Sequence, residues 1–208
     1  MGVIHLQAFL ITMMVFTVTP GVDTFYILNR SVQQGKAAGV YSTLGIVTGL
    51  CIHICLATFG LSVILAQSAI AFTILKFAGA IYLLYLGVNK VFEKESSAQK
   101  IKGYKNESLK KIYTSAIITN LFNPKVALFF LAFFPQFIDS AQINNPLPFI
   151  LLGTVTVVIT LIWFTLLALG ASTVTHKLKK HTSFHKWFSK ISGLVFITLG
   201  LKIAFSKQ

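Results

Sequence analysis

Charged residues are scarce in this sequence, and acidic residues are the scarcest. Of its 208 residues 11% are charged, with 18 basic and 5 acidic side chains, whereas a soluble domain carries about 25%. Hydrophobic residues make up 55%, and the mean hydropathy is +0.77. Several apolar runs approach the roughly 20 residues that cross a bilayer as a helix. The lack of charge excludes an ordinary soluble domain and predicts an all-α integral membrane protein.

Arginine is almost absent, because Arg30 is the only one and the other basic residues are lysines. In a soluble protein, a net charge of +13 would favour nucleic acid as a partner. Here the basic residues collect in short links between apolar runs, and no stretch interleaves them with aromatic residues for stacking on bases. We therefore expect no nucleic-acid partner, and we assign the basic links to the cytoplasmic side.

The sequence also lacks the motifs of cofactor-dependent and catalytic proteins. Cys51 and Cys55 are the only cysteines, and their spacing places both on one face of one apolar helix. A thiol–disulfide carrier with a cysteine in each half is thereby excluded. No phosphate-binding loop, metal motif or nucleophile–base pair stands out, so we expect no enzyme activity, catalytic residue, cofactor or metal. His53, inside an apolar run, is interpreted as a hydrogen-bonded packing residue.

Two apolar runs are each interrupted by a proline beside a charge. The first contains Thr19-Pro20-Gly21 followed by Asp23, and the second contains Asn123-Pro124-Lys125. Proline removes a backbone donor and breaks a helix, and a carboxylate at membrane depth costs about 2.5–3.5 kcal/mol. The two prolines stand half a chain length apart. Such paired breaks indicate a functional site rather than packing alone.

Six apolar spans are expected along the chain. They cover about residues 6–28, 35–66, 71–92, 112–134, 149–171 and 191–205. The N-terminus lacks the positive segment and cleavage site of a signal peptide, so the first run is expected to stay in the membrane. The links after the first, third and fifth spans carry the basic residues, which places both termini outside the cytoplasm.

The two halves resemble each other beyond the prolines. The third span contains Lys76, Gly79 and Gly87, and the last span contains Lys190, Gly193 and Gly200 at nearly the same spacing. Because three spans are an odd number, the halves must insert in opposite directions, which is a pattern of transporters. We expect one transport domain over 1–208, with repeat 1 at about 1–92, a cytoplasmic linker at 93–111 and repeat 2 at about 112–208.

Glycines recur at spacings that allow close helix contacts in lipid. The candidates for helix packing are Gly45, Gly49, Gly79, Gly87, Gly193 and Gly200.

The two breaks together suit a zwitterion such as an amino acid. Asp23 and freed carbonyls would meet its ammonium, while Lys125 and backbone N–H groups would meet its carboxylate. The candidate residues for substrate binding or coupling are Thr19, Pro20, Gly21, Asp23, Asn120, Asn123, Pro124 and Lys125. An ion pair between Asp23 and Lys125 that only locks the halves together is the structural alternative. We also hypothesise that Asp23 carries a proton as the coupling ion.

These same motifs, with the Phe134-Pro135-Gln136-Phe137 block, resemble the LysE/RhtB family of amino-acid exporters nearly from end to end. The resemblance implies six transmembrane helices in the bacterial inner membrane, export of amino acids in exchange for protons, and dimers. It leaves open whether the substrate is neutral or basic. The family usually has a second proline where Val22 stands, so a milder break is expected at Pro20 than in relatives.

The expected function is therefore secondary active export of small neutral amino acids or their derivatives by proton antiport. The alternative is export of another small solute or a metal cation by the same fold. Metal export would require several intramembrane carboxylates, histidines or thiolates. Asp23, His53 and the two cysteines are the only candidates, and they are not clustered in the sequence.

Overall fold

The computed structural model describes residues 2–61, 69–92 and 107–171, together with scattered positions between 190 and 205. Most of the expected linker 93–111 and most of the sixth expected span lie outside this part of the chain. The organisation into six spans and two inverted repeats therefore stays a prediction.

Regular structure in the described residues is helical, apart from one antiparallel bridge between Val3 and Ile138. The α-helices are α1 (Leu6–Val18), α2 (Val22–Gln34), α3 (Lys36–Leu56), α5 (Ala69–Val91), α6 (Leu109–Leu121), α7 (Pro124–Leu128) and α8 (Pro146–Leu169). The π-helical turns η1 (Ala57–Leu61) and η2 (Phe129–Phe133) follow α3 and α7, and the 3-10 turns are η3 (Phe134–Phe137) and η4 (Ser140–Gln142). The prediction of an all-α protein is confirmed.

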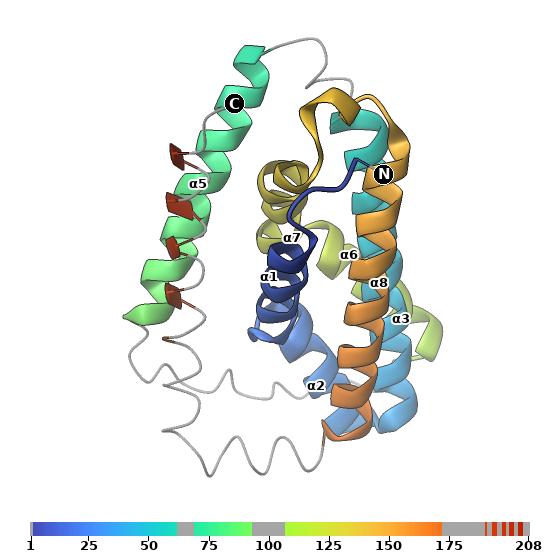
Figure 1. Ribbon diagram of the computed structural model, residues 1–208. Coiled ribbons are helices and arrows are strands. Elements are labelled where there is room, and N and C mark those ends of the chain that lie inside the picture. Colours follow the sequence, from blue (N-terminus) through green and yellow to red (C-terminus); the bar gives the residue numbers. More distant parts are fainter. Residues whose placement is uncertain are drawn as a thin grey trace.

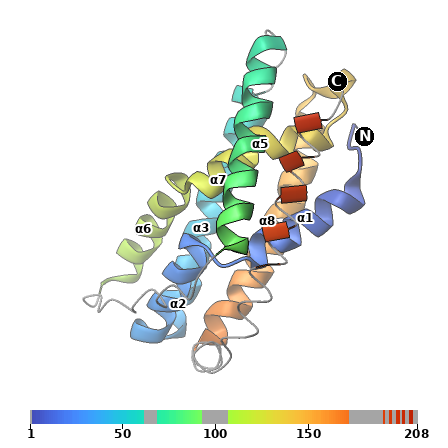
Figure 2. The same cartoon turned by 90° about the vertical axis from the view of Figure 1, so that its left-hand side faces the viewer.

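Both proline motifs bend their spans sharply. The axes of α1 and α2 differ by 47°, and the helices on either side of Pro124 differ by 49°. Figures 1 and 2 show the two bent pairs, with α1 and α2 in blue and α6 and α7 in green to yellow. The bend at Pro20 is almost as large as the bend at Pro124, and the expectation of a milder break than in relatives stays a prediction.

Helix α3 is the centre of the packing, since it lies against α2, α6 and α8. Residues 36–60 and α8 are long and apolar enough to cross a membrane, and each bent pair adds one more candidate span. In Figure 1 the N-terminus and the segment after η2 lie at the upper end, and α2 and α8 end at the lower end.

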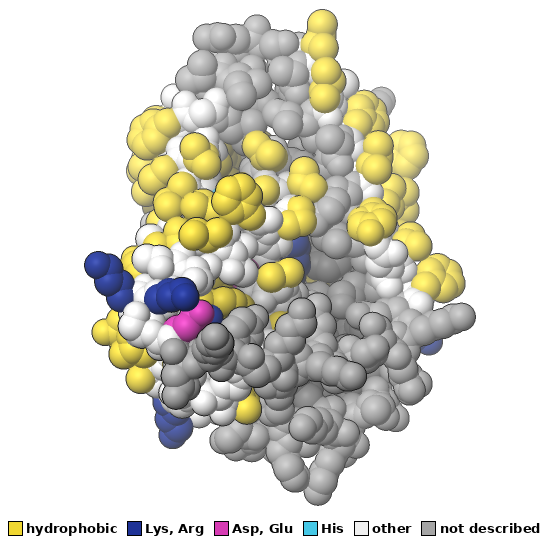
Figure 3. All heavy atoms as spheres, turned by 180° about the vertical axis from the view of Figure 1, so that it is seen from behind, with side chains coloured by type: hydrophobic (Ala, Val, Ile, Leu, Met, Phe, Trp, Pro, Cys, Tyr) yellow, Lys and Arg dark blue, Asp and Glu magenta, His cyan; other side chains and the backbone are white. Residues whose placement is uncertain are grey.

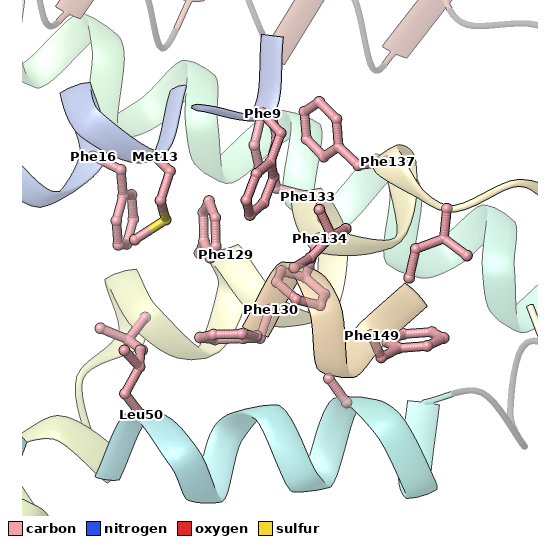
Figure 4. Close-up of a cluster of buried hydrophobic side chains, with 14 of the residues drawn as sticks. Phe9, Met13, Phe16, Leu50, Phe129, Phe130, Phe133, Phe134, Phe137 and Phe149 are labelled. Carbon is pink, nitrogen blue, oxygen red and sulfur yellow. The ribbon is translucent and has the colours of Figure 1, made fainter. Parts of the chain in front are cut away.

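Two separate clusters of buried hydrophobic side chains form the core. The first is rich in phenylalanine and includes Phe9, Phe129, Phe134 and Phe149; Figure 4 shows these rings packed between α1, η2 and α3. The rings of Phe9 and Phe134 meet edge to face, with centroids 5.9 Å apart. The second cluster contains Tyr26, Ile27, Leu28, Ala38, Ile46, Ile112, Ala116, Phe164, Leu167, Ala168 and Ala171.

The outer surface of the described residues is apolar, as a bilayer requires. Ile11, Ile162 and Leu166 are each more than half exposed, although side chains of this kind are normally buried in soluble proteins. Hydrophobic side chains cover most of the described surface in Figure 3, while most of the visible basic side chains lie in its lower part. The exposed apolar belt supports the prediction of an integral membrane protein.

A charged cluster joins α2 to the start of α6. The guanidinium of Arg30, 2% exposed, donates to Glu107 at 2.6 Å and to the side chain of Gln34 at 2.9 Å. Lys111 lies 3.2 Å from the other oxygen of Glu107. Arg30 and Glu107 come from links that the sequence assigns to the same cytoplasmic side, and the structure brings the two residues together.

Several of the expected packing glycines lie where no side chain would fit. A Cβ atom on Gly45 would lie 2.4 Å from the carbonyl oxygen of Tyr113, and one on Gly49 would lie 2.7 Å from Oδ1 of Asn120. Gly87 and Gly193 each approach the backbone of the other, and Gly200 approaches Ala80 and Leu84. Gly79 lies in α5, but its surroundings lie outside the described residues. We propose that these contacts set the helix spacing.

Replacing Gly45 by alanine is expected to lower the thermal midpoint of the detergent-solubilised protein. The added methyl group meets the backbone of α6, which cannot move as a flexible side chain would, and overpacking of this kind costs about 1–3 kcal/mol. Gly60→Ala is the matched control, because a Cβ atom there has nothing within 4 Å. Equal midpoints for the two variants would contradict the packing role of Gly45.

Replacing Glu107 by glutamine is expected to destabilise the protein at neutral pH, and the difference should shrink in acid. Desolvation alone would raise the pKa of Glu107, but the hydrogen bonds and charges of Lys111 and Arg30 outweigh it and hold the pKa below its ordinary value of 4.5. A carboxyl whose pKa is lower in the folded state stabilises the protein fully above pH 4.5 and loses that effect as the pH falls through its folded pKa.

The measurement is the thermal midpoint of both proteins between pH 7 and pH 4. A constant difference over this range would show that ionisation of Glu107 is not what stabilises the cluster.

Candidate functional site

The break at Pro20 leaves one backbone carbonyl without its helical donor. In a continuous helix the carbonyl of Phe16 would accept from the N–H of residue 20, but proline has none. The last such bond of α1 runs from the N–H of Thr19 to Val15. Gly21 then continues in an extended conformation, with φ −145° and ψ −168°, and α2 begins at Val22.

Lys125 supplies the missing donor from the other half of the chain. Its Nζ donates to the carbonyl of Phe16 at 2.8 Å and to that of Thr19 at 3.0 Å. The same ammonium lies over the ring of Phe16, 4.3 Å from its centroid, which is a cation–π contact. A cation at the carboxyl end of α1 is also favoured by the helix dipole.

The break at Pro124 is completed differently. Pro124 denies a donor to the carbonyl of Asn120, four residues earlier, but the N–H of Asn123 donates to that oxygen at 3.0 Å, and Nε2 of His53 lies 3.3 Å from it. Because a carbonyl only accepts, the contact with His53 is a hydrogen bond in the tautomer that carries the proton on Nε2. The His53 ring also stacks on Phe130. This hydrogen-bonded packing role is the one expected of His53.

Asp23 is buried in the first turn of α2, where its side chain is held by α6. Only 7% of Asp23 is exposed, and its Oδ2 accepts from Nδ2 of Asn120 at 2.9 Å. The amino end of a helix favours a carboxylate. Asn123 begins α7 as its N-cap, with Oδ1 accepting from the N–H of Lys125 at 3.0 Å.

Asp23 and Lys125 are neighbours without a direct ion pair. The ion pairs of 4.0 Å or less within the described residues join Glu107 to Arg30 and Lys111, and none joins Asp23 to Lys125. The two groups still interact electrostatically, since both border one space. Each is instead held by polar groups of the other half of the chain, so the structure does not show the locking ion pair considered from the sequence.

These residues border a buried cavity between the two hydrophobic clusters. Its volume is about 30 Å³, which suits a water molecule and is too small for an amino acid. The lining comprises Met13, Phe16, Thr17, Thr19, Gly21, Asp23, Thr24, Ile46, Leu50, Asn120, Asn123, Lys125, Val126, Thr160 and Phe164. The described conformation is therefore closed around its polar centre.

Six of the eight candidate residues line this cavity, namely Thr19, Gly21, Asp23, Asn120, Asn123 and Lys125. Pro20 and Pro124 shape it through the bends. The sequence interpretation missed Thr17, Thr24 and Thr160. Thr17 precedes Pro20 by three residues, and Thr24 directly follows Asp23. Their closeness in the sequence to these candidates could have predicted that they line the same site. No sequence motif indicated Thr160, which lies in the middle of α8, an unbroken apolar helix.

Comparison with known proteins agrees with this architecture. The sequence profile of the LysE type translocator family matches residues 14–207. The uncharacterized membrane protein YrhP of Bacillus subtilis (strain 168) is 33% identical over 91% of this chain and 93% of its own length.

Relatives in other bacteria align over similar lengths. A leucine efflux protein of Salmonella typhimurium is 28% identical over 98% of this chain and 96% of its own length, and an uncharacterized membrane protein of Vibrio cholerae is 31% identical over 96% of both. No solved structure matches. With its paired helix breaks and its apolar surface, this chain is a membrane protein of the LysE type translocator family.

Proposed function

We propose that this protein exports amino acids across the cytoplasmic membrane of a bacterium by secondary active transport. The observation that carries the proposal is the closed cavity in which Asp23 and Lys125 stand at two interrupted helices without pairing directly. A cavity with separated opposite charges is complementary to a zwitterion. Family membership and the leucine efflux relatives support the same substrate class.

The carboxylate of the substrate would lie between Lys125 and the start of α2. The first N–H groups of a helix have no acceptor in that helix, and Gly21 provides no side-chain cap. A Cβ atom on Gly21 would lie 3.7 Å from Nζ of Lys125, so this ammonium is close to the amino end of α2. The two donors together form an anion-binding arrangement.

The side chain of the substrate is expected to be neutral and apolar. Asp23 is the only acidic residue among the described residues that line the cavity, and the α-ammonium would already use it. Met13, Ile46, Leu50 and Phe164 supply an apolar wall opposite the polar groups. A basic side chain would need a second acid, whereas a leucine-like side chain needs only apolar contacts.

Transport requires the closed cavity to open to each side in turn. The phenylalanine-rich cluster and the cluster around Tyr26 and Phe164 both contribute residues to the lining of the cavity. We propose that rocking of the two repeats separates one cluster at a time, as inverted repeats allow. A metal cation is a weaker candidate substrate, because the described residues contain no group of three or more histidine, cysteine and acidic side chains.

Uptake of labelled amino acids into inside-out vesicles tests the export activity. Vesicles that contain the protein should accumulate leucine and other neutral amino acids faster than vesicles without it, and an imposed pH gradient with an acidic interior should increase accumulation. Lysine and glutamate serve as charged comparisons. Absence of transport for every amino acid in the panel would refute the proposed function.

Replacing Asp23 by asparagine tests proton coupling. Asparagine keeps the shape and a hydrogen-bonding oxygen but cannot bind and release a proton. The variant is expected to exchange internal for external leucine while losing accumulation driven by the pH gradient. If Asp23→Asn still accumulates leucine against its gradient with unchanged pH dependence, Asp23 is not the proton carrier.

A further inference from the structure

Hydroxyl groups in these helices usually donate a hydrogen bond to a backbone carbonyl of their own helix. The hydroxyl donates to the carbonyl four residues earlier, as the hydroxyl of Thr12 does to Ala8 at 2.7 Å and that of Thr19 does to Val15 at 2.6 Å. The same bond is made by Ser42, Thr43, Thr48, Thr58, Thr119, Thr154, Thr156 and Thr198. This is the ordinary solution for a hydroxyl in an apolar helix.

Thr17 departs from this pattern, as does Ser31 of α2, but Ser31 does not line the cavity. Thr17 lies in α1 between Thr12 and Thr19 and is 5% exposed, as Thr12 is. Its hydroxyl oxygen is buried and has no hydrogen-bond partner in the part of the chain that the structure describes. A buried unpaired hydroxyl costs about 1–3 kcal/mol. Thr17 and Asp23 line the same cavity, so a ligand in the cavity is an available partner for Thr17.

Asp23 also keeps one oxygen for a ligand. Its Oδ2 is occupied by Asn120, whereas Oδ1 is buried and accepts no hydrogen bond of good geometry from the described residues, although the amide of Asn123 is near the carboxylate. Oδ1 of Asn120 is unpartnered too, but it lies against α3, where a Cβ atom on Gly49 would be 2.7 Å away. Lys125 already donates to the carbonyls of Phe16 and Thr19. The hydroxyls of Thr24 and Thr160 also line the cavity, but among the described residues the fully buried acceptors that line it, apart from Oδ1 of Asn120, are those of Thr17 and Asp23.

We propose that Thr17 and Asp23 together form the subsite for the substrate's primary ammonium, and that Thr17 makes the site selective for an amine with at least two N–H groups. This inference rests on the proposed function. A primary ammonium has three N–H donors, of which Asp23 takes one with charge assistance and Thr17 takes a second. Two N-methyl groups leave a single N–H donor, which cannot bond both oxygens, and add apolar volume beside them. A site built to bond an N–H group rejects an analogue that lacks it.

The experiment measures competition for leucine uptake in inside-out vesicles in sodium-free buffer. For the wild-type protein, unlabelled leucine should compete at least about tenfold better than N,N-dimethylleucine, the effect of one charge-assisted hydrogen bond. Thr17→Val keeps the shape of the side chain but removes the hydroxyl. It should weaken leucine binding by about tenfold or more and reduce the preference for leucine over N,N-dimethylleucine.

Two further variants separate a binding role from a structural one. Thr17→Ser keeps a hydroxyl and is expected to recover the leucine affinity that Thr17→Val loses. Thr12→Val is the matched control, since Thr12 is equally buried in the same helix but bonded to Ala8. It should keep the wild-type preference for leucine.

The outcomes distinguish this inference from the proposed function. Leucine uptake by Thr17→Val with wild-type half-saturation and wild-type discrimination would overturn the subsite while leaving amino-acid export intact. An equal loss in Thr12→Val, or no recovery in Thr17→Ser, would also overturn it. If Thr17→Val does not insert, Thr17→Ala provides the same comparison with a smaller side chain. Absence of uptake by the wild-type protein would instead refute the proposed function.

Discussion

A proline has no backbone N–H, so Pro20 leaves the carbonyl of Phe16 without its helical donor. In this protein a lysine from the other half of the chain donates a hydrogen bond to that carbonyl. Lys125 donates to Phe16 and to Thr19 and covers the ring of Phe16. In lipid there is no water to replace this bond, so an unpaired carbonyl would be costly. This contact therefore satisfies the backbone where Pro20 bends the chain between α1 and α2, next to the buried Asp23.

Each half of the chain contacts the break in the other half. Lys125 of the second half donates to the carbonyl of Phe16 at the first break, and His53 of the first half lies 3.3 Å from the carbonyl of Asn120 at the second break, which also accepts from the N–H of Asn123. Asn120 in turn donates to Asp23. Polar groups that would be unfavourable singly are thus joined into one network at the centre of the bundle. That network separates two hydrophobic clusters and borders a closed cavity with unsatisfied oxygens.

Much of this arrangement could be predicted from the sequence. The scarcity of charge predicted a membrane protein, and the membership in the translocator family confirms the resemblance drawn from the Pro20 and Pro124 motifs. Both helix breaks were predicted as well, because proline acts on its own helix whatever surrounds it. Six of the eight candidate residues line the cavity. The neighbouring Thr17 was missed, since a threonine in an apolar helix usually bonds to its own backbone.

The sequence by itself determined where the helices break, which residues are charged at those breaks, and that the chain lies in a membrane, because these depend on local covalent geometry and on composition. Only the tertiary structure decided the partners. Asp23 accepts from Asn120 rather than from Lys125, and Lys125 donates to two carbonyls. Thr17 and Thr160 line the cavity. Hydrogen bonds between residues about a hundred positions apart depend on how helices pack side by side, and no local pattern encodes that distance.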